Sequence, residues 1–169
     1  EFGRRRVSLQ TEKGALEIVQ GITRLTPEYA AISAQKYGWD FGLGINQIPQ
    51  ETVLQILRNP VICKPDDPQD RMSRARFCIQ AGWYAQADAE LETIAADFPM
   101  LAEQAGNVRQ ELRQLFGRDV LRELTRRKNV GQYQLAEQAA RQMSPTLGAG
   151  IARDVERFLA ELKQTRDQQ

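Results

Sequence analysis

Two short stretches of the same pattern decide the fold of this chain: residues 81–87 read AGWYAQA, and residues 130–136 read VGQYQLA. In each stretch a tyrosine follows the glycine by two positions and an alanine follows it by five. Apolar residues at helical spacing come next, and a proline closes each pattern, at Pro99 and at Pro145. Glycine permits a tight turn between helices, and alanine lets two helix backbones approach closely. The pattern predicts helical hairpins, which are typical of scaffolds rather than of catalytic sites.

Outward from these turns, apolar spacing predicts helices from Pro49 onward. The first helix should end at Asn59-Pro60, and the polar, proline-rich stretch 60–68 should be a connector. Further helices are expected over residues 70–80, 85–97, 100–128, 134–143 and a last stretch that carries apolar residues from Leu147 to Leu162. Gly117 lies inside the long helix, where it costs about 1 kcal/mol relative to alanine, and we expect it to mark a kink.

Before residue 49 the pattern is that of β-strands. Apolar residues alternate with polar ones on both sides of Glu12-Lys13-Gly14, which predicts a hairpin. Residues 26–38 fit either a helix or a turn followed by a strand over 29–33, and we favour the strand because an isolated hairpin is marginally stable. Residues 37–48 predict a further strand with Trp39, Phe41, Leu43 and Ile45 on one face.

The expected fold class is therefore α+β and mostly α: a small N-terminal antiparallel β module followed by an α-helical hairpin array. The expected boundaries are 1–48 for the β module, 49–69 for the first helix and the connector, and 70–166 for the array. Glu1-Phe2 is what a common cloning junction encodes, so we expect the chain to be a piece of a longer protein, and its localisation stays open.

Composition narrows the function. The 169 residues include 23 basic and 22 acidic side chains and no histidine. The balanced charge argues against a dedicated nucleic-acid binder, and the lack of histidine excludes Ser-His-Asp catalysis and histidine zinc sites. The sequence contains no phosphate loop, dinucleotide fingerprint or nucleophile elbow. We therefore expect no enzyme, no cofactor, no metal and no membrane-spanning segment.

The only two cysteines, Cys63 and Cys78, are expected to be buried thiols, with a disulfide between them as the alternative. Trp39 with Phe41, and Trp83 with Tyr84, are expected in the core rather than stacked on a ligand.

Residues 70–99 resemble a tetratricopeptide repeat. The positions that carry the resemblance are small, glycine, aromatic, apolar and proline positions in register: Ala75, Gly82, Tyr84, Ala87, Leu91, Ile94 and Pro99. Two features depart from that family: Arg71 and Arg74 stand where it usually has large apolar residues, and the two glycines lie 49 residues apart, whereas its period is about 34 residues. The chain looks like a divergent, repeat-like segment, similar to helical-repeat segments of large bacterial proteins.

The resemblance implies a concave groove that binds extended peptides through the first helix of each hairpin. The positions carried over are Met72, Arg76, Ile79 and Gln80 from the first hairpin, and Leu121, Thr125 and Lys128 from the second. Basic side chains there favour an acidic peptide or a C-terminal carboxylate. The alternative is that these side chains face solvent or pack on the β module.

We expect a non-enzymatic protein–protein interaction or scaffolding segment of a larger protein. One alternative is nucleic-acid binding through the β module and an arginine stripe on the long helix, formed by Arg109, Arg113, Arg118, Arg122, Arg126 and Arg127. A solvated charged face explains the same stripe, because acidic residues are interleaved with it. Another alternative is a non-catalytic part of a larger enzyme. Glu90 and Glu92 point to different faces of a helix, so they are not a catalytic pair.

Overall fold

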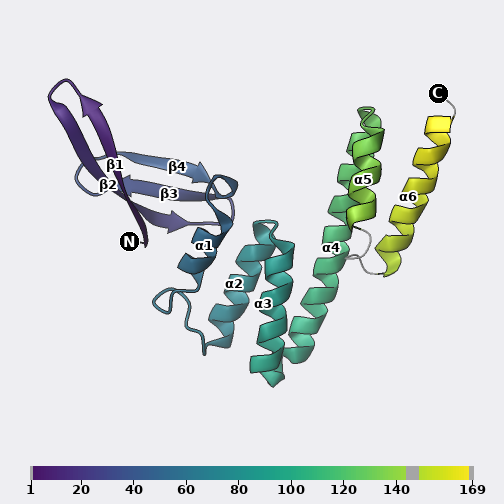
Figure 1. The fold of residues 1–169 in the computed structure, drawn as a ribbon. Coiled ribbons are helices and arrows are strands. Elements are labelled where there is room, and N and C mark those ends of the chain that lie inside the picture. Colours follow the sequence, from purple (N-terminus) through teal and green to yellow (C-terminus); the bar gives the residue numbers. More distant parts are fainter. Residues whose placement is uncertain (1, 144–148, 168–169) are drawn as a thin grey trace. The chain divides into compact units, whose positions relative to one another are not determined.

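The computed structural model describes residues 2–143 and 149–167, and it has a four-stranded antiparallel sheet followed by helices (Figure 1). Helices hold 60% of the residues and strands 21%, so the predicted class, α+β and mostly α, is confirmed. The chain divides into two compact units, Glu1–Ala102 and Glu103–Gln169. The sheet and the first helical hairpin both lie in the first unit, and the domain boundaries expected from the sequence, 1–48, 49–69 and 70–166, stay a prediction.

The sheet is a meander in the order β1-β2-β3-β4. Its strands are β1 (Phe2–Thr11), β2 (Gly14–Leu25), β3 (Tyr29–Ala34) and β4 (Asp40–Gly44). Gly14 has φ 111°, a backbone conformation that glycine adopts readily, and it pairs with Thr11 across the predicted turn. Of the two alternatives for residues 26–38, the strand is confirmed and the helix is wrong. The last predicted strand is shorter, because residues 45–47 form the 3₁₀ turn η1 (Ile45–Gln47).

One face of the sheet is apolar and carries the core of the β module. Cross-strand partners share a face, and the register places Ile32 opposite both Ile22 and Phe41 on this face. Ile18 and Ile32 are buried there. Helix α1 (Gln50–Leu57) covers part of the face, since a Cβ added at Gly3 would lie 3.1 Å from Ile22 Cδ1 and 3.7 Å from Ile56 Cδ1.

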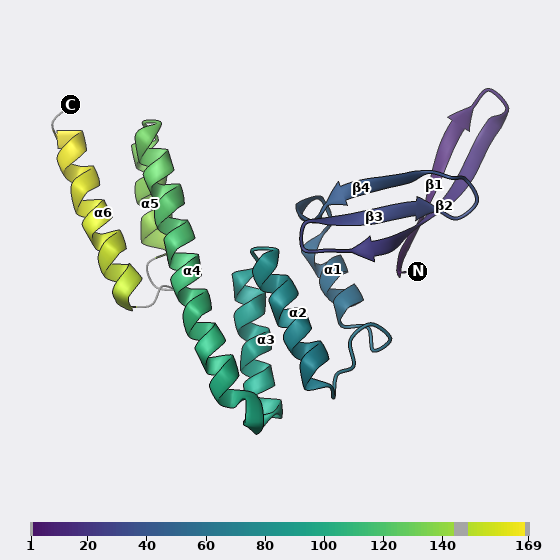
Figure 2. The same cartoon turned by 180° about the vertical axis from the view of Figure 1, so that it is seen from behind.

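The first unit continues with α2 (Pro68–Gln80), α3 (Tyr84–Asp97) and the 3₁₀ turn η2 (Pro99–Leu101). Asp67 begins α2 as its N-cap, accepting hydrogen bonds from the backbone N–H groups of Gln69 and Asp70. The second unit consists of α4 (Ala102–Asn129), α5 (Tyr133–Met143) and α6 (Ala149–Asp167) (Figure 2). Each helix predicted from apolar spacing is present; Leu147, which was expected in the last of them, lies outside the described residues.

Candidate functional site

The two predicted hairpins have the same turn. Gly82 and Gly131 have φ 75° and 76°. Two backbone hydrogen bonds define the first turn: Gly82 N donates to Ile79 O (3.0 Å), and Trp83 N donates to Cys78 O (2.8 Å). Both have counterparts 49 positions further along the chain. These counterparts are Gly131 N to Lys128 O (3.0 Å) and Gln132 N to Arg127 O (2.9 Å). Glycine at a positive φ ends the first helix and allows both bonds to form. The repeated sequence pattern is therefore a repeated backbone structure.

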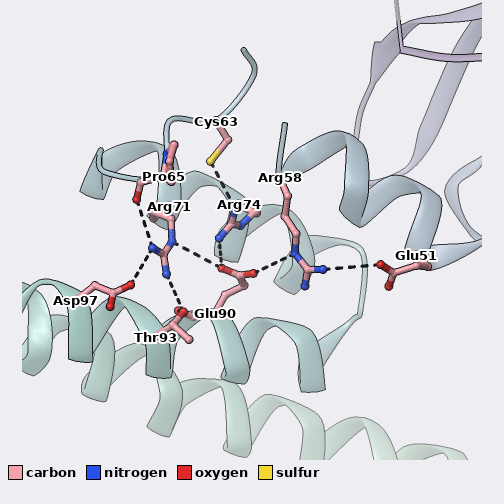
Figure 3. A network of polar contacts seen from close by, with 9 residues as sticks. All are labelled: Glu51, Arg58, Cys63, Pro65, Arg71, Arg74, Glu90, Thr93 and Asp97. Carbon is pink, nitrogen blue, oxygen red and sulfur yellow. Dashed lines mark hydrogen bonds and ion pairs between the residues drawn. The ribbon is translucent and has the colours of Figure 1, made fainter. Parts of the chain in front are cut away.

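A buried network of arginines and a glutamate fastens α2 to α3 (Figure 3). Glu90, on α3, is 8% exposed and forms ion pairs with Arg71 and Arg74 of α2. Arg74 also donates a hydrogen bond to the same glutamate oxygen, and Arg58 Nε lies 3.9 Å from the other one. The buried carboxylate of Glu90 thus forms ion pairs with three guanidinium groups.

Arg71 connects this network to three further groups. It donates hydrogen bonds to Asp97 Oδ2 at 3.0 Å, to Thr93 Oγ1 at 2.8 Å and to the backbone carbonyl of Pro65 at 3.3 Å. Its guanidinium carbon also lies 5.9 Å from the ring centre of Phe98. The connector before α2 is therefore held to the hairpin by the same side chain that joins the two helices.

The composition of this network indicates a structural role. Arginine side chains stay protonated and offer no proton to a reaction, so Glu90 is the only buried group in the network that could exchange one. It is instead engaged by three cations. Glu92 is exposed on another face of α3, which confirms that the two glutamates do not form a pair. Among the described residues, no group of three or more His, Cys, Asp or Glu side chains could hold a metal ion.

Both cysteines are buried and free, so the disulfide alternative is wrong. Burial raises the pKa of the Cys78 thiol to about 11, with Glu90 adding to the effect, and burial also raises the pKa of Cys63. A protonated, buried thiol is a poor nucleophile. Cys63 Sγ accepts a long contact from Arg74 Nη1 at 3.9 Å, so it belongs to the packing around the network.

The second unit is held together by apolar contacts instead. Its core joins three helices through buried residues: Val120 and Leu124 of α4, Ala136 and Ala140 of α5, and Val155, Phe158 and Leu162 of α6. Gly117 lets α6 approach α4, because an added Cβ would lie 2.6 Å from Ile151 Cγ1 and 2.7 Å from Ile151 Cγ2. The glycine that we expected to mark a kink has a packing role.

A shallow depression of about 480 Å³ lies on α4 near its C-terminal end. Its lining consists of Leu121, Arg122, Thr125, Arg126, Asn129 and Val130. Val130 is 65% exposed, so its side chain presents apolar surface to solvent at the depression. Among the described residues of the lining, the two arginines are the only charged ones, which makes the depression an apolar surface with a positive rim.

The seven residues carried over from the repeat resemblance have different surroundings. Leu121 and Thr125 line the depression. Lys128 instead lies 3.3 Å from Glu161 Oε2 and 5.9 Å from the ring centre of Phe158, and so takes part in the contact between α4 and α6.

In the first unit, Met72 is 3% exposed and belongs to the core, so it offers no surface to a partner. Arg76 and Gln80 are exposed, and Ile79 is half-buried. A groove that unites these positions with those of the second unit stays a prediction.

The predicted arginine stripe on α4 has local acidic partners. Arg122 lies 3.2 Å from Asp119, and Arg127 lies 2.8 Å from Glu123. The hydrogen bond from Arg127 lowers the pKa of the Glu123 carboxyl. Interleaved carboxylates reduce the positive potential that a nucleic-acid backbone would meet. Nucleic-acid binding stays a prediction that no contact on this helix favours.

Sequence reasoning missed two features. It placed Trp39 and Phe41 in the core, but they are 48% and 36% exposed, because β4 is the edge strand of the sheet. It also missed the role of Glu90. The signal was present: Arg71 and Arg74 stand at positions where the repeat pattern has apolar residues, and a charged residue at such a position needs a buried partner.

Comparisons with known proteins return no relative. No protein-family model, no curated protein and no solved structure matches this chain. No helix in the described part of the chain is both long and apolar enough to cross a lipid bilayer.

Proposed function

We propose that this chain is a non-enzymatic interaction segment that binds an acidic peptide of a partner protein in the depression on α4. The observation that carries the proposal is the lining of that depression, in which exposed apolar surface at Val130 is flanked by Arg122 and Arg126. An extended peptide with apolar and acidic side chains matches both properties. The expected resemblance to a peptide-binding helical repeat supports the same reading, since the depression lies on the first helix of the second hairpin.

The two arginines can engage a ligand without large cost. Arg122 is 80% exposed in its pair with Asp119, and an exposed pair of this kind contributes at most about 1 kcal/mol. Exchanging one carboxylate partner for another is therefore nearly neutral. The affinity should come from the buried apolar side chains of the peptide, and the selectivity for acidic peptides from the arginines.

A pair of fluorescein-labelled peptides tests the proposal: both contain the same leucines, one with glutamates and the other with lysines between them. We expect saturable binding of the glutamate peptide, measured by fluorescence anisotropy, and no binding of the lysine peptide. The double variant Arg122→Glu/Arg126→Glu should lose about tenfold or more in affinity, since two attractive rim charges become repulsive.

The matched control is Arg153→Glu/Arg157→Glu, which makes the same charge change on exposed positions of α6. Its affinity should stay within about twofold of the unmodified chain. Equal binding of both peptides, equal loss in both double variants or no saturable binding would contradict the proposal.

A further inference from the structure

The two edges of the sheet are protected to different degrees. β1 carries three consecutive arginines, residues 4–6, whereas the β4 sequence, DFGLG over residues 40–44, has a single charged residue, Asp40 at its start, and no proline. Charged side chains and proline are what natural edge strands use to prevent pairing with another chain. β4 lies at the outer side of the sheet, and no other strand in the described part of the first unit pairs with that side (Figure 1).

The backbone of β4 offers hydrogen-bonding groups on that outer side. The Trp39 carbonyl accepts a hydrogen bond from Ala34 N at 3.0 Å, and Ile45 N donates to the Glu28 carbonyl at 2.9 Å. In an antiparallel strand the N–H and C=O of one residue point to the same side, and the side alternates along the strand. Odd-numbered residues from 39 to 45 therefore face β3, and Asp40 and Gly42 direct their backbone groups outward.

From this geometry we propose that β4 pairs antiparallel with β4 of a second copy of this chain, with the two-fold axis at Gly42. An axis through a hydrogen-bonded pair must lie at Asp40, Gly42 or Gly44, which direct their backbone groups outward, whereas an axis at Phe41 or Leu43 has no hydrogen bond at its centre. An axis at Asp40 sets two aspartates opposite each other, which is unfavourable. At Gly44 the outward N–H already donates a hydrogen bond to Gln47 Oε1, at 2.9 Å. Gly42 is the register without either conflict at its centre.

The Gly42 register is complementary in its side chains. It sets Phe41 of one copy opposite Leu43 of the other, twice, and it sets Asp40 opposite Gly44, so no like charges meet. Phe41 and Leu43 lie on the apolar face, opposite Ile32 and Ala30 of β3. Pairing would continue this face across the axis and cover Phe41, which is 36% exposed. Aromatic–aliphatic cross-strand pairs are stabilising.

The contact is short, so the association should be weak, and the dimer should form mainly at high protein concentration. Interfaces that bury less than about 1,200 Å² are usually transient. In sedimentation equilibrium on the full chain, the mean mass should rise from 19.2 kDa toward twice that value as the concentration increases. The amide hydrogen of Gly42 should exchange more slowly in the same series. A mass of 19.2 kDa up to the solubility limit would overturn the proposal.

Substitutions test the register. Phe41→Lys should weaken the association by at least about tenfold, since both cross-strand pairs lose an aromatic partner. Leu43→Glu should do the same, and a mixture of the two variants should associate more strongly than either alone, because the register sets the new lysine opposite the new glutamate. Circular dichroism of each variant checks that the fold is retained.

The control is Tyr29→Lys, which places the same charge on the opposite face of the sheet, where Tyr29 pairs with Gly44. Its self-association should match that of the unmodified chain within about twofold. Association that persists unchanged in Phe41→Lys, or a mixture that associates no better than its components, would overturn pairing through β4.

Discussion

The two helical hairpins share one backbone turn and differ in what holds their helices together. In the first, α2 and α3 bury apolar residues such as Leu91 and Ile94 and are also joined by Glu90 and its arginines, two of which are almost fully buried. In the second, α4, α5 and α6 meet through an apolar cluster and the close approach at Gly117. The turn is a local property of a glycine-containing segment, whereas the contact between helices is open to either solution. The same turn thus joins one pair of helices whose apolar core includes a buried ionic network and another whose core cluster is apolar.

The two units can be followed separately in one unfolding experiment. Both tryptophans of the chain, Trp39 and Trp83, belong to the first unit. Tryptophan fluorescence therefore reports unfolding of the first unit alone, and far-ultraviolet circular dichroism reports the helices of both. The comparison between hairpins becomes a comparison between two transitions in the same sample.

The largest loss of folding stability is expected for Glu90→Gln. The substitution keeps the shape of the side chain but leaves the guanidinium groups of Arg71 and Arg74 without a buried countercharge. Removing one partner from a buried ionic network costs about 3–5 kcal/mol. The free energy of unfolding of the first unit, measured by tryptophan fluorescence, should fall by that amount, and its transition should move to lower denaturant concentration. The transition of the second unit should stay in place.

Glu92→Gln provides the control, because this glutamate is exposed on the same helix and its replacement should change stability by less than about 0.5 kcal/mol. Comparable losses in the two variants would show that the network does not hold the hairpin. A triple replacement by apolar residues, Arg71→Leu/Arg74→Met/Glu90→Leu, should cost less than Glu90→Gln alone, since no charge is left unpaired.

A smaller change in folding stability is expected when the glycines of α4 are replaced by alanine. Gly117→Ala forces the added methyl group into Ile151, and overpacking of this kind costs about 1–3 kcal/mol. The gain in helix propensity, about 1 kcal/mol, offsets only part of it. The second unit should lose stability, measured by the circular dichroism change that fluorescence does not follow.

Gly106→Ala is the matched control on the same helix. An added Cβ at Gly106 meets nothing within 4 Å, so only the gain in helix propensity remains. We expect stabilisation by up to about 1 kcal/mol. If both alanine variants change stability in the same direction, the close approach of α6 at Gly117 is wrong.

A loss of stability of similar size is expected at the turns themselves. Gly82→Ala and Gly131→Ala place a Cβ at φ 75° and 76° in open surroundings, so the cost comes from backbone conformation alone, about 1–2 kcal/mol. The two losses should be equal within about 0.5 kcal/mol, the first seen by fluorescence and the second by circular dichroism. Clearly unequal losses would mean that the two turns are not equivalent, despite their identical hydrogen bonds.

Much of the fold could be predicted because its signals are local. The hairpin turn at Gly14 and the turns at Gly82 and Gly131 depend on a few neighbouring residues. The helix expected from residue 70 begins two residues earlier, at Pro68. The stretch 26–38 left two alternatives, because a proline-initiated turn suits both a helix and a strand. Only the pairing of Ile32 with Ile22 and Phe41 decides for the strand, and that pairing joins residues distant in sequence.

The positions carried over from the repeat resemblance lie only in part at the depression on α4. Leu121 and Thr125 both line it, because residues one turn apart share a face of the helix. Met72 was also carried over from the repeat resemblance, but it is buried. The sequence of α2 alone does not show on which side of the helix α3 packs. Trp39 and Phe41 look like core residues by composition, and only the order of strands shows that they lie at an edge.

Local sequence patterns are enough to predict that this chain is mostly helical with a β-rich start, and to predict where the chain turns. These properties depend on backbone preferences and on periodicity within single elements. Tertiary structure alone decided that Glu90 is buried among arginines, that Gly117 makes room for Ile151, and that β4 is left as an open edge. Each of these depends on which elements meet, because burial and electrostatic pairing are properties of contacts between segments far apart in the chain.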